Sequence, residues 1–154
     1  FLSGVCSTIA EADAKVDDLL NSGAAAEKLK ELVKAQNGDP RIVDDPGLLP
    51  QAPVIHQVKA TEAGFLKSLA ARQLGLAGLK LGAGRLRKSD PIDPAVGLVL
   101  RKRVGERVEV GDVLCDVHAA DLESAKQAET EVLKSVSLSR QAVEPPPEIS
   151  EWVE

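Results

Sequence analysis

The chain has 154 residues, 44% of them hydrophobic, and its 19 basic and 24 acidic side chains give a formal net charge of −5. No apolar run approaches the roughly 18 residues that mark a membrane-spanning helix, and the apolar content is too high for a disordered chain. Aromatic residues make up only 2%, too few for base-stacking platforms, and the net acidity argues against binding a phosphate backbone. We therefore expect a folded, cytoplasmic protein with neither nucleic acid nor a membrane as partner.

The first residues carry neither an initiator Met nor a charged leader. Phe1 to Gly4 open the chain inside an apolar stretch, without the basic region of a secretory signal. We therefore expect a piece of a longer polypeptide. Cys6 and Cys115 are expected to be reduced thiols, because cytosolic chains rarely keep disulfides.

Residues 1–38 are predicted to form a helical hairpin. Apolar residues recur with a helical period over residues 9–20, and Gly23 follows as a helix stop. Ser22 is predicted to cap a second helix, which residues 37–38 end because Asn and Gly tolerate a left-handed backbone.

Residues 39–53 hold four prolines, an acidic pair and a glycine, a composition that favours an extended linker over regular structure. A domain boundary is expected there. The predicted organisation is a helical segment over residues 1–38, a linker over 39–53 and a second domain over 54–154.

The second domain is predicted to start with a β-hairpin. Residues 54–60 have the composition of a strand, residues 61–64 that of a turn, and residues 65–67 that of a short partner strand. The elements predicted after it are a helix over 69–81 ending at Gly82, an extended segment over 92–100, glycine turns at 105 and 111 beside short strands, a strand over 113–118, a helix from Asp121 to about Lys134, and a tail at 149–153 after three prolines. The pattern predicts an α+β fold.

The glycine-rich segment Leu81–Arg85 is the most obvious candidate for phosphate binding. It lacks the third glycine of the dinucleotide fingerprint, where Arg87 stands, and it follows a predicted helix rather than a strand. A P-loop would need glycine directly before Lys88, and Arg87 again occupies that position. We therefore expect a structural turn, with Arg85 buried or between domains.

Basic residues cluster between positions 80 and 103. Seven of them stand against two acidic residues, a local charge of +5 (7 − 2), namely Lys80, Arg85, Arg87, Lys88, Arg101, Lys102 and Arg103. The cluster is either a phosphate-facing patch or a solvated face that pairs with the acidic remainder of the chain, and we favour the second interpretation. Arg85 and Lys88 are the candidates for a residue in a substrate cleft or between domains.

No group of side chains predicts catalysis or metal binding. Cys115 and His118 are three apart on a predicted strand, so they point to opposite faces and cannot share a metal ion. His56 is expected to be partly buried and hydrogen-bonded. Because no nucleophile stands beside a base, we predict no catalytic residue, no cofactor-binding residue and no metal ligand in this chain.

Several motifs, in order along the chain, resemble those of one enzyme family. They are Ala26–Leu29 with Val33–Pro40, Lys59-Ala60 followed by Gly64-Phe65, Leu81–Arg85, Ile92–Gly97, the spacing Gly105-x-x-Val108-x-x-Gly111-Asp112-x-Leu114, and Ile149–Glu151. Together they cover essentially residues 8–151. The sequence is similar to the C-terminal part of pyrimidine-nucleoside and thymidine phosphorylases.

The resemblance implies an enzyme that cleaves the N-glycosidic bond of thymidine or uridine with inorganic phosphate, giving the free base and a pentose 1-phosphate. Residues 1–37 would be the last helices of its catalytic lobes. Residues 53–154 would be an α/β-hammerhead domain, with β-hairpins and two helices, that moves to close the cleft. The family's substrate-binding motifs, and the residues that bind a monovalent cation in some members, precede the matched region, so no catalytic residue is carried over. The complete enzyme would be a homodimer.

Two other functions fit parts of the sequence. The spacing from Gly105 to Leu114 also resembles the hairpin of biotinyl or lipoyl carrier domains, but the next lysine, Lys126, lies on a predicted helix, and Lys59 lies far upstream. A stand-alone interaction domain would instead use the apolar residues 1–9 as a docking surface. The phosphorylase is the function that we favour.

Overall fold

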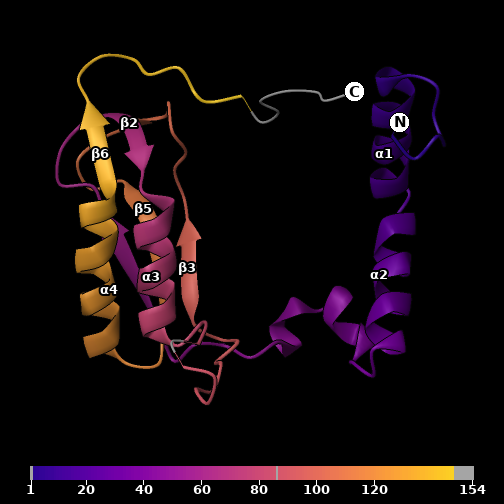
Figure 1. Ribbon diagram of the computed structural model, residues 1–154, viewed down its shortest axis with the longest axis horizontal. Coiled ribbons are helices and arrows are strands. Elements are labelled where there is room, and N and C mark those ends of the chain that lie inside the picture. The colour runs from indigo at the N-terminus through magenta and orange to yellow at the C-terminus, as the bar shows by residue number, and fades with distance from the viewer. Residues whose placement is uncertain (1, 86, 148–154) are drawn as a thin grey trace. The chain divides into compact units, whose positions relative to one another are not determined.

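The computed structural model describes residues 2–85 and 87–147 (Figure 1). It falls into two compact units, one ending at Leu49 and the other beginning at Pro50. The tail predicted at residues 149–153, which includes the family-like Ile149–Glu151 motif, lies outside the described residues. No helix in the described ranges combines the length and the apolar character needed to cross a bilayer.

The first unit contains both predicted helices, α1 (Ile9–Asn21) and α2 (Ala24–Ala35). α2 ends where Asn37 takes up a left-handed conformation (φ 61°) and the Gly38 N–H donates to the Val33 carbonyl at 2.9 Å. This is the helix-ending geometry that an Asn-Gly pair favours. Both helices are therefore confirmed.

The connection between α1 and α2 differs from the predicted hairpin. Ser22 ends α1, its N–H donating to the Asp18 carbonyl, and the residue that precedes α2 is a left-handed Gly23 (φ 79°). Neither helix contributes a buried residue, and α2 continues beyond α1 rather than folding back along it (Figure 1). Because the apolar faces of the two helices stay exposed, the close packing of a hairpin is not formed.

Residues 40–48 form two short 3₁₀ helices, η1 (Pro40–Val43) and η2 (Pro46–Leu48), where the composition predicts extended chain. In each, the Asp side chain before the proline accepts a hydrogen bond from the backbone N–H two residues further on. Proline suits the first helical position because an N–H there would have no partner within the helix. The Asp-Pro pairs at 39–40 and 45–46 therefore encode turns.

The second unit contains two three-stranded antiparallel sheets. The first has the order β1-β5-β3 and consists of β1 (Val54–Lys59), β5 (Val113–Ala119) and β3 (Gly97–Leu100). The second has the order β4-β2-β6 and consists of β4 (Arg107–Val108), β2 (Gly64–Leu69) and β6 (Val136–Ser139). Together with the helices, these sheets confirm the predicted α+β class.

The strands do not pair as the predicted hairpins require. β1 pairs with β5 along its length, whereas β2 lies in the other sheet. The residue after β1, Ala60, donates to the Asp112 carbonyl and accepts from the Gly111 N–H, both at 2.8 Å. In the described part of the chain, strands that follow one another in sequence are never paired. The β-hairpin predictions are therefore wrong, because every strand finds its partner through non-local contacts.

Two helices, α3 (Ala71–Leu81) and α4 (Leu122–Ser135), pack on one face of the first sheet (Figure 1). Both were predicted, and the Asp121 side chain starts α4 by accepting from the Ser124 N–H at 2.7 Å. β6 follows α4 without a turn signal and has no counterpart among the predicted elements. The buried core of this layer consists of Val58, Cys115, Val117, Ala119, Ala125, Ala128 and Val132.

Candidate functional site

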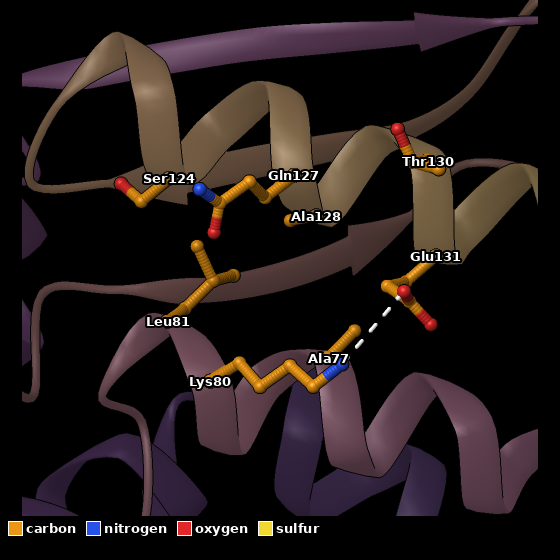
Figure 2. Close-up of a pocket in the computed structure, with 8 residues that line it drawn as sticks. All are labelled: Ala77, Lys80, Leu81, Ser124, Gln127, Ala128, Thr130 and Glu131. Atoms are coloured by element: carbon orange, nitrogen blue, oxygen red, sulfur yellow. Dashed lines mark ion pairs between the residues drawn. The ribbon is translucent and has the colours of Figure 1, made fainter.

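A groove of about 250 Å³ lies between α3 and α4 (Figure 2). Ala77 and Ala128, both almost fully buried, leave this space open because their side chains are single methyl groups. Lys80 on α3 reaches toward Glu131 on α4, with 3.7 Å between Nζ and Oε1. Gln127, one turn before Glu131 in α4, faces the same groove.

The hydroxyl groups that line this groove serve the local backbone. The Ser124 Oγ donates to the Asp121 carbonyl at 3.0 Å, and the Thr130 Oγ1 donates to the Lys126 carbonyl at 3.1 Å. The lining residues include no histidine that could activate either hydroxyl. The groove can hold a side chain or a short segment, but it carries no nucleophile and base.

The glycine-rich segment ends α3, as predicted. Gly82 is left-handed (φ 102°), and the Ala83 N–H donates to the Gly78 carbonyl at 3.0 Å. Gly84 sits so close to Leu79 that a Cβ on it would lie 2.4 Å from Leu79 Cδ2. Gly82 is therefore required by backbone shape, whereas a side chain at Gly84 would have to displace the end of the Leu79 side chain.

The predicted site residues Arg85 and Lys88 lie in the loop after α3, and both are exposed. Of the two places expected for Arg85, buried or between domains, the structure excludes burial within the second unit, because the residue is exposed there. The structure brings neither residue into the α3–α4 groove. Their role in a cleft or between domains stays a prediction.

Three other residues of the basic cluster pair with acidic residues of the same unit. Lys102 Nζ lies 3.0 Å from Asp112 Oδ2, and this contact holds the pKa of the Asp112 carboxyl below its usual value. Lys80 pairs with Glu131 across the groove, and Arg101 pairs with Asp116. These contacts support the interpretation of the cluster as a charge-paired face.

Asp116, in the central strand β5, is the buried charge of the described chain, with 5% of its surface exposed. Arg101 donates to its Oδ2 from Nε at 2.6 Å, and Nη2 forms an ion pair with the same oxygen at 2.5 Å. This pair was not predicted. The sequence feature that could have indicated the pair is an aspartate inside an apolar strand, because a carboxylate buried there requires a partner.

His56 on β1 meets Glu129 on α4, with 2.8 Å between Nε2 and Oε2 and 25% and 32% of the two side chains exposed. The predicted half-buried, hydrogen-bonded histidine is confirmed.

The Cys115 thiol is fully buried, and burial raises its pKa to about 11, so that it is protonated and unreactive at neutral pH. Within residues 2–85 and 87–147, no three His, Cys, Asp or Glu side chains are placed to hold a metal ion.

The lysines considered for a carrier function lie in regular structure. Lys59 is the last residue of β1 and faces Val113 of β5 in the sheet. Lys126 lies within α4. Because a carrier domain presents its modified lysine on a tight turn, neither position favours that function.

The second unit is similar to a known protein family. Residues 65–139, from β2 through β6, match the family described as pyrimidine nucleoside phosphorylase C-terminal domain. The matched range contains α3, α4 and the groove between them.

Curated relatives extend the similarity toward the N-terminus. The chain is 40% identical over 144 residues to a pyrimidine-nucleoside phosphorylase of Bacillus subtilis (strain 168), a match that covers 94% of this chain and 33% of the relative. It is 43% identical over 118 residues to a pyrimidine-nucleoside phosphorylase of Staphylococcus aureus (strain USA300), covering 77% of this chain and 27% of the relative. The chain thus spans a third or less of the length of these relatives. At most 10 residues (154 − 144) of the chain lie outside the match to the Bacillus subtilis relative. That match therefore includes most of the first unit.

The whole family match lies in the α+β unit after Pro50. The longer alignments relate 94% and 77% of the chain to pyrimidine-nucleoside phosphorylases. Residues 65–139 are therefore similar to the C-terminal domain of pyrimidine nucleoside phosphorylases.

Proposed function

We propose that the chain is the C-terminal portion of an enzyme that cleaves a pyrimidine nucleoside with inorganic phosphate, releasing the free base and a pentose 1-phosphate. The observation that carries this proposal is the 40% identity over 94% of the chain to the Bacillus subtilis pyrimidine-nucleoside phosphorylase. Identity of this extent covers both units, so it does not depend on one shared domain.

The chain's own contribution is proposed to be structural. Phosphorolysis needs a site for the phosphate anion and donors for the leaving base. In the groove between α3 and α4, the hydroxyls of Ser124 and Thr130 donate to local backbone carbonyls, and the buried Cys115 thiol is protonated. The catalytic groups would therefore come from the part of the enzyme that this chain does not match.

Residues 54–154 are proposed to act as a domain that closes over the substrate cleft. Closure excludes water and strengthens the electrostatic interactions of bound phosphate. The boundary between Leu49 and Pro50 supports this proposal, because it falls inside the linker predicted at 39–53. The helices of residues 1–38 would belong to the catalytic lobes, and their apolar faces, which bury nothing within the first unit, would pack there.

The partners of the whole enzyme follow from the same proposal. They are the N-terminal remainder, a second copy in a homodimer, the nucleoside and phosphate. Any monovalent cation would be bound by the remainder, and the enzyme would lie in the cytoplasm.

Arg85 and Lys88 would face the cleft or the other lobe, since both are exposed after the Gly82 turn. In a complete enzyme, Arg85→Ala is expected to raise the KM for phosphate. An unchanged KM, turnover and stability would remove Arg85 from the site.

A chimera tests the proposed function. The part of the Bacillus subtilis relative that matches this chain is replaced by residues 1–154, and release of uracil from uridine is measured with and without phosphate. We expect phosphate-dependent release that exceeds that of the same relative truncated before the match. A folded chimera no more active than the truncated enzyme would contradict the proposal.

A further inference from the structure

The first sheet, β1-β5-β3, has one face toward the helices and one face away from them. Cys115 and Val117 of β5 belong to the buried core shared with α4. Because side chains alternate along a strand, Asp116 and His118 point to the opposite face. The helices that pack on this sheet, α3 and α4, lie on the core side (Figure 1). We call the opposite side the open face of the sheet.

The strand register brings two rows of three residues together on the open face. They are Ile55, His118 and Gly97 in one row and Gln57, Asp116 and Val99 in the next. An antiparallel sheet whose outer face meets only water normally carries polar residues there. Ile55, with 58% of its surface exposed, and Val99, with 40%, depart from that pattern. Their exposure indicates a face that another layer covers.

Two polar groups of the open face have no side-chain partner among the described residues. Asp116 Oδ1 is buried and accepts no hydrogen bond there, although Oδ2 pairs with Arg101. The half-buried imidazole of His118 forms no side-chain hydrogen bond or ion pair with the described residues. Buried polar groups are almost always paired. A covering layer that carries hydrogen-bonding groups would supply these partners, directly or through water.

The size of the open face indicates what can cover it. The three strands lie about 4.8 Å apart and share a stretch of four residues, which gives an area of about 200 Å². A stable interface between separate proteins takes about 800 Å² from each partner. The face is too small to hold a free partner or a second copy by itself. Part of the same polypeptide needs less area, because its tether gives it a high effective concentration.

We propose that the open face packs on the catalytic part of the complete enzyme, within the same polypeptide. This inference rests on the proposed function, since the chain covers 33% of its Bacillus subtilis relative and leaves 67% (100 − 33) to that part. The contacting surface is apolar where it meets Ile55 and Val99, and it carries a hydrogen-bonding group for His118. The sheet, and not the helices α3 and α4, then forms the side of the closing domain that meets the rest of the enzyme.

Thiol labelling of the chimera with the Bacillus subtilis relative tests this contact. Ile55→Cys and, separately, Val99→Cys place a reporter on the open face, and peptide mass spectrometry reads its alkylation apart from that of Cys6. We expect each reporter to react at least about tenfold more slowly in the chimera than in the 154-residue chain. The reason is that a thiol in a packed interface reacts only when the interface opens.

The matched control is Val110→Cys. Val110 is 67% exposed and lies outside the open face, in the turn before β5, so its alkylation rate should be the same in both proteins. Equal protection of this control would overturn the proposal, because the slower labelling would then not be specific to the open face. Protection in the chain alone that grows with its concentration would also overturn it, since it marks a second copy.

Phosphate-dependent release of uracil by the parent chimera separates this inference from the proposed function. Release together with unchanged labelling of both reporters would overturn the contact and leave the proposed function intact. Protected reporters in a folded chimera without release would contradict the proposed function and still support the contact.

Discussion

The buried carboxylate of Asp116 is paired with the guanidinium of Arg101. Its Oδ2 accepts a hydrogen bond from Arg101 Nε and forms an ion pair with Nη2, while Oδ1 is buried without a hydrogen-bond partner among the described residues. Removing the guanidinium would leave a buried carboxylate with no cation. We expect Arg101→Ala to lower the free energy of unfolding by about 1–3 kcal/mol, measured by urea denaturation.

A matched variant separates this effect from a general loss of charge. Arg107 pairs with Glu109, and both side chains are more than half exposed. Exposed pairs of this kind contribute little, so Arg107→Ala should change stability by less than about 1 kcal/mol. Equal effects of the two substitutions would show that burial of Asp116 is not what makes its pair important.

Cys115 gives a prediction on reactivity and pH. Burial raises its pKa from 9.0 to about 11, which means that folding favours the protonated thiol. The stability that this provides is complete below pH 9 and is lost as the pH rises toward 11, because the unfolded chain releases the proton first.

Alkylation at pH 8 tests the burial of this thiol. We expect iodoacetamide to label the partly exposed Cys6 in the folded chain and to leave Cys115 unmodified, as read by mass spectrometry of the peptides. In denaturant both should be labelled. Labelling of Cys115 at the rate of Cys6 in the native chain would refute its placement in the core.

Among the elements, α3 contains one glycine within the helix and ends at another, and replacing each by alanine tests how the helix ends. Gly82 is left-handed at φ 102°, whereas a Cβ added at Gly78, inside the helix, would meet no atom within 4 Å. Gly82→Ala should destabilise by about 1–2 kcal/mol, and Gly78→Ala should stabilise by about 0.5–1 kcal/mol. Urea denaturation of both variants measures the two signs. Changes of the same sign would mean that the end of α3 is not set by Gly82.

The elements also show how far the sequence alone could predict this fold. The four helices were predictable because their boundaries are local, as in the Asp121 cap and the Asn37-Gly38 stop. Strand pairing was not, because Ala60 bonds to the turn at Gly111 and not to a neighbour in sequence. For the same reason the Arg101–Asp116 pair was missed, whereas the turn at Gly82 and the hydrogen-bonded His56 were foreseen from local context.

At the scale of the whole molecule, stability should differ between the two units. The buried core clusters all lie after Pro50, while the helices up to Leu49 contribute no buried residue. Amides in such helices open with little cost. We expect hydrogen exchange in α1 and α2 of the isolated chain to be much faster than in β5. Equal protection of these segments would mean that the first unit has a core of its own.

We propose that this chain completes a pyrimidine-nucleoside phosphorylase without supplying its catalytic groups. Phosphate-dependent uracil release tests this proposal when it is measured side by side for three proteins: the chain alone, the truncated Bacillus subtilis relative, and the chimera of the two. We expect no activity for the chain alone and a turnover for the chimera well above that of the truncated enzyme. Turnover by the chain alone, or a folded chimera without phosphate-dependent release, would contradict the proposal.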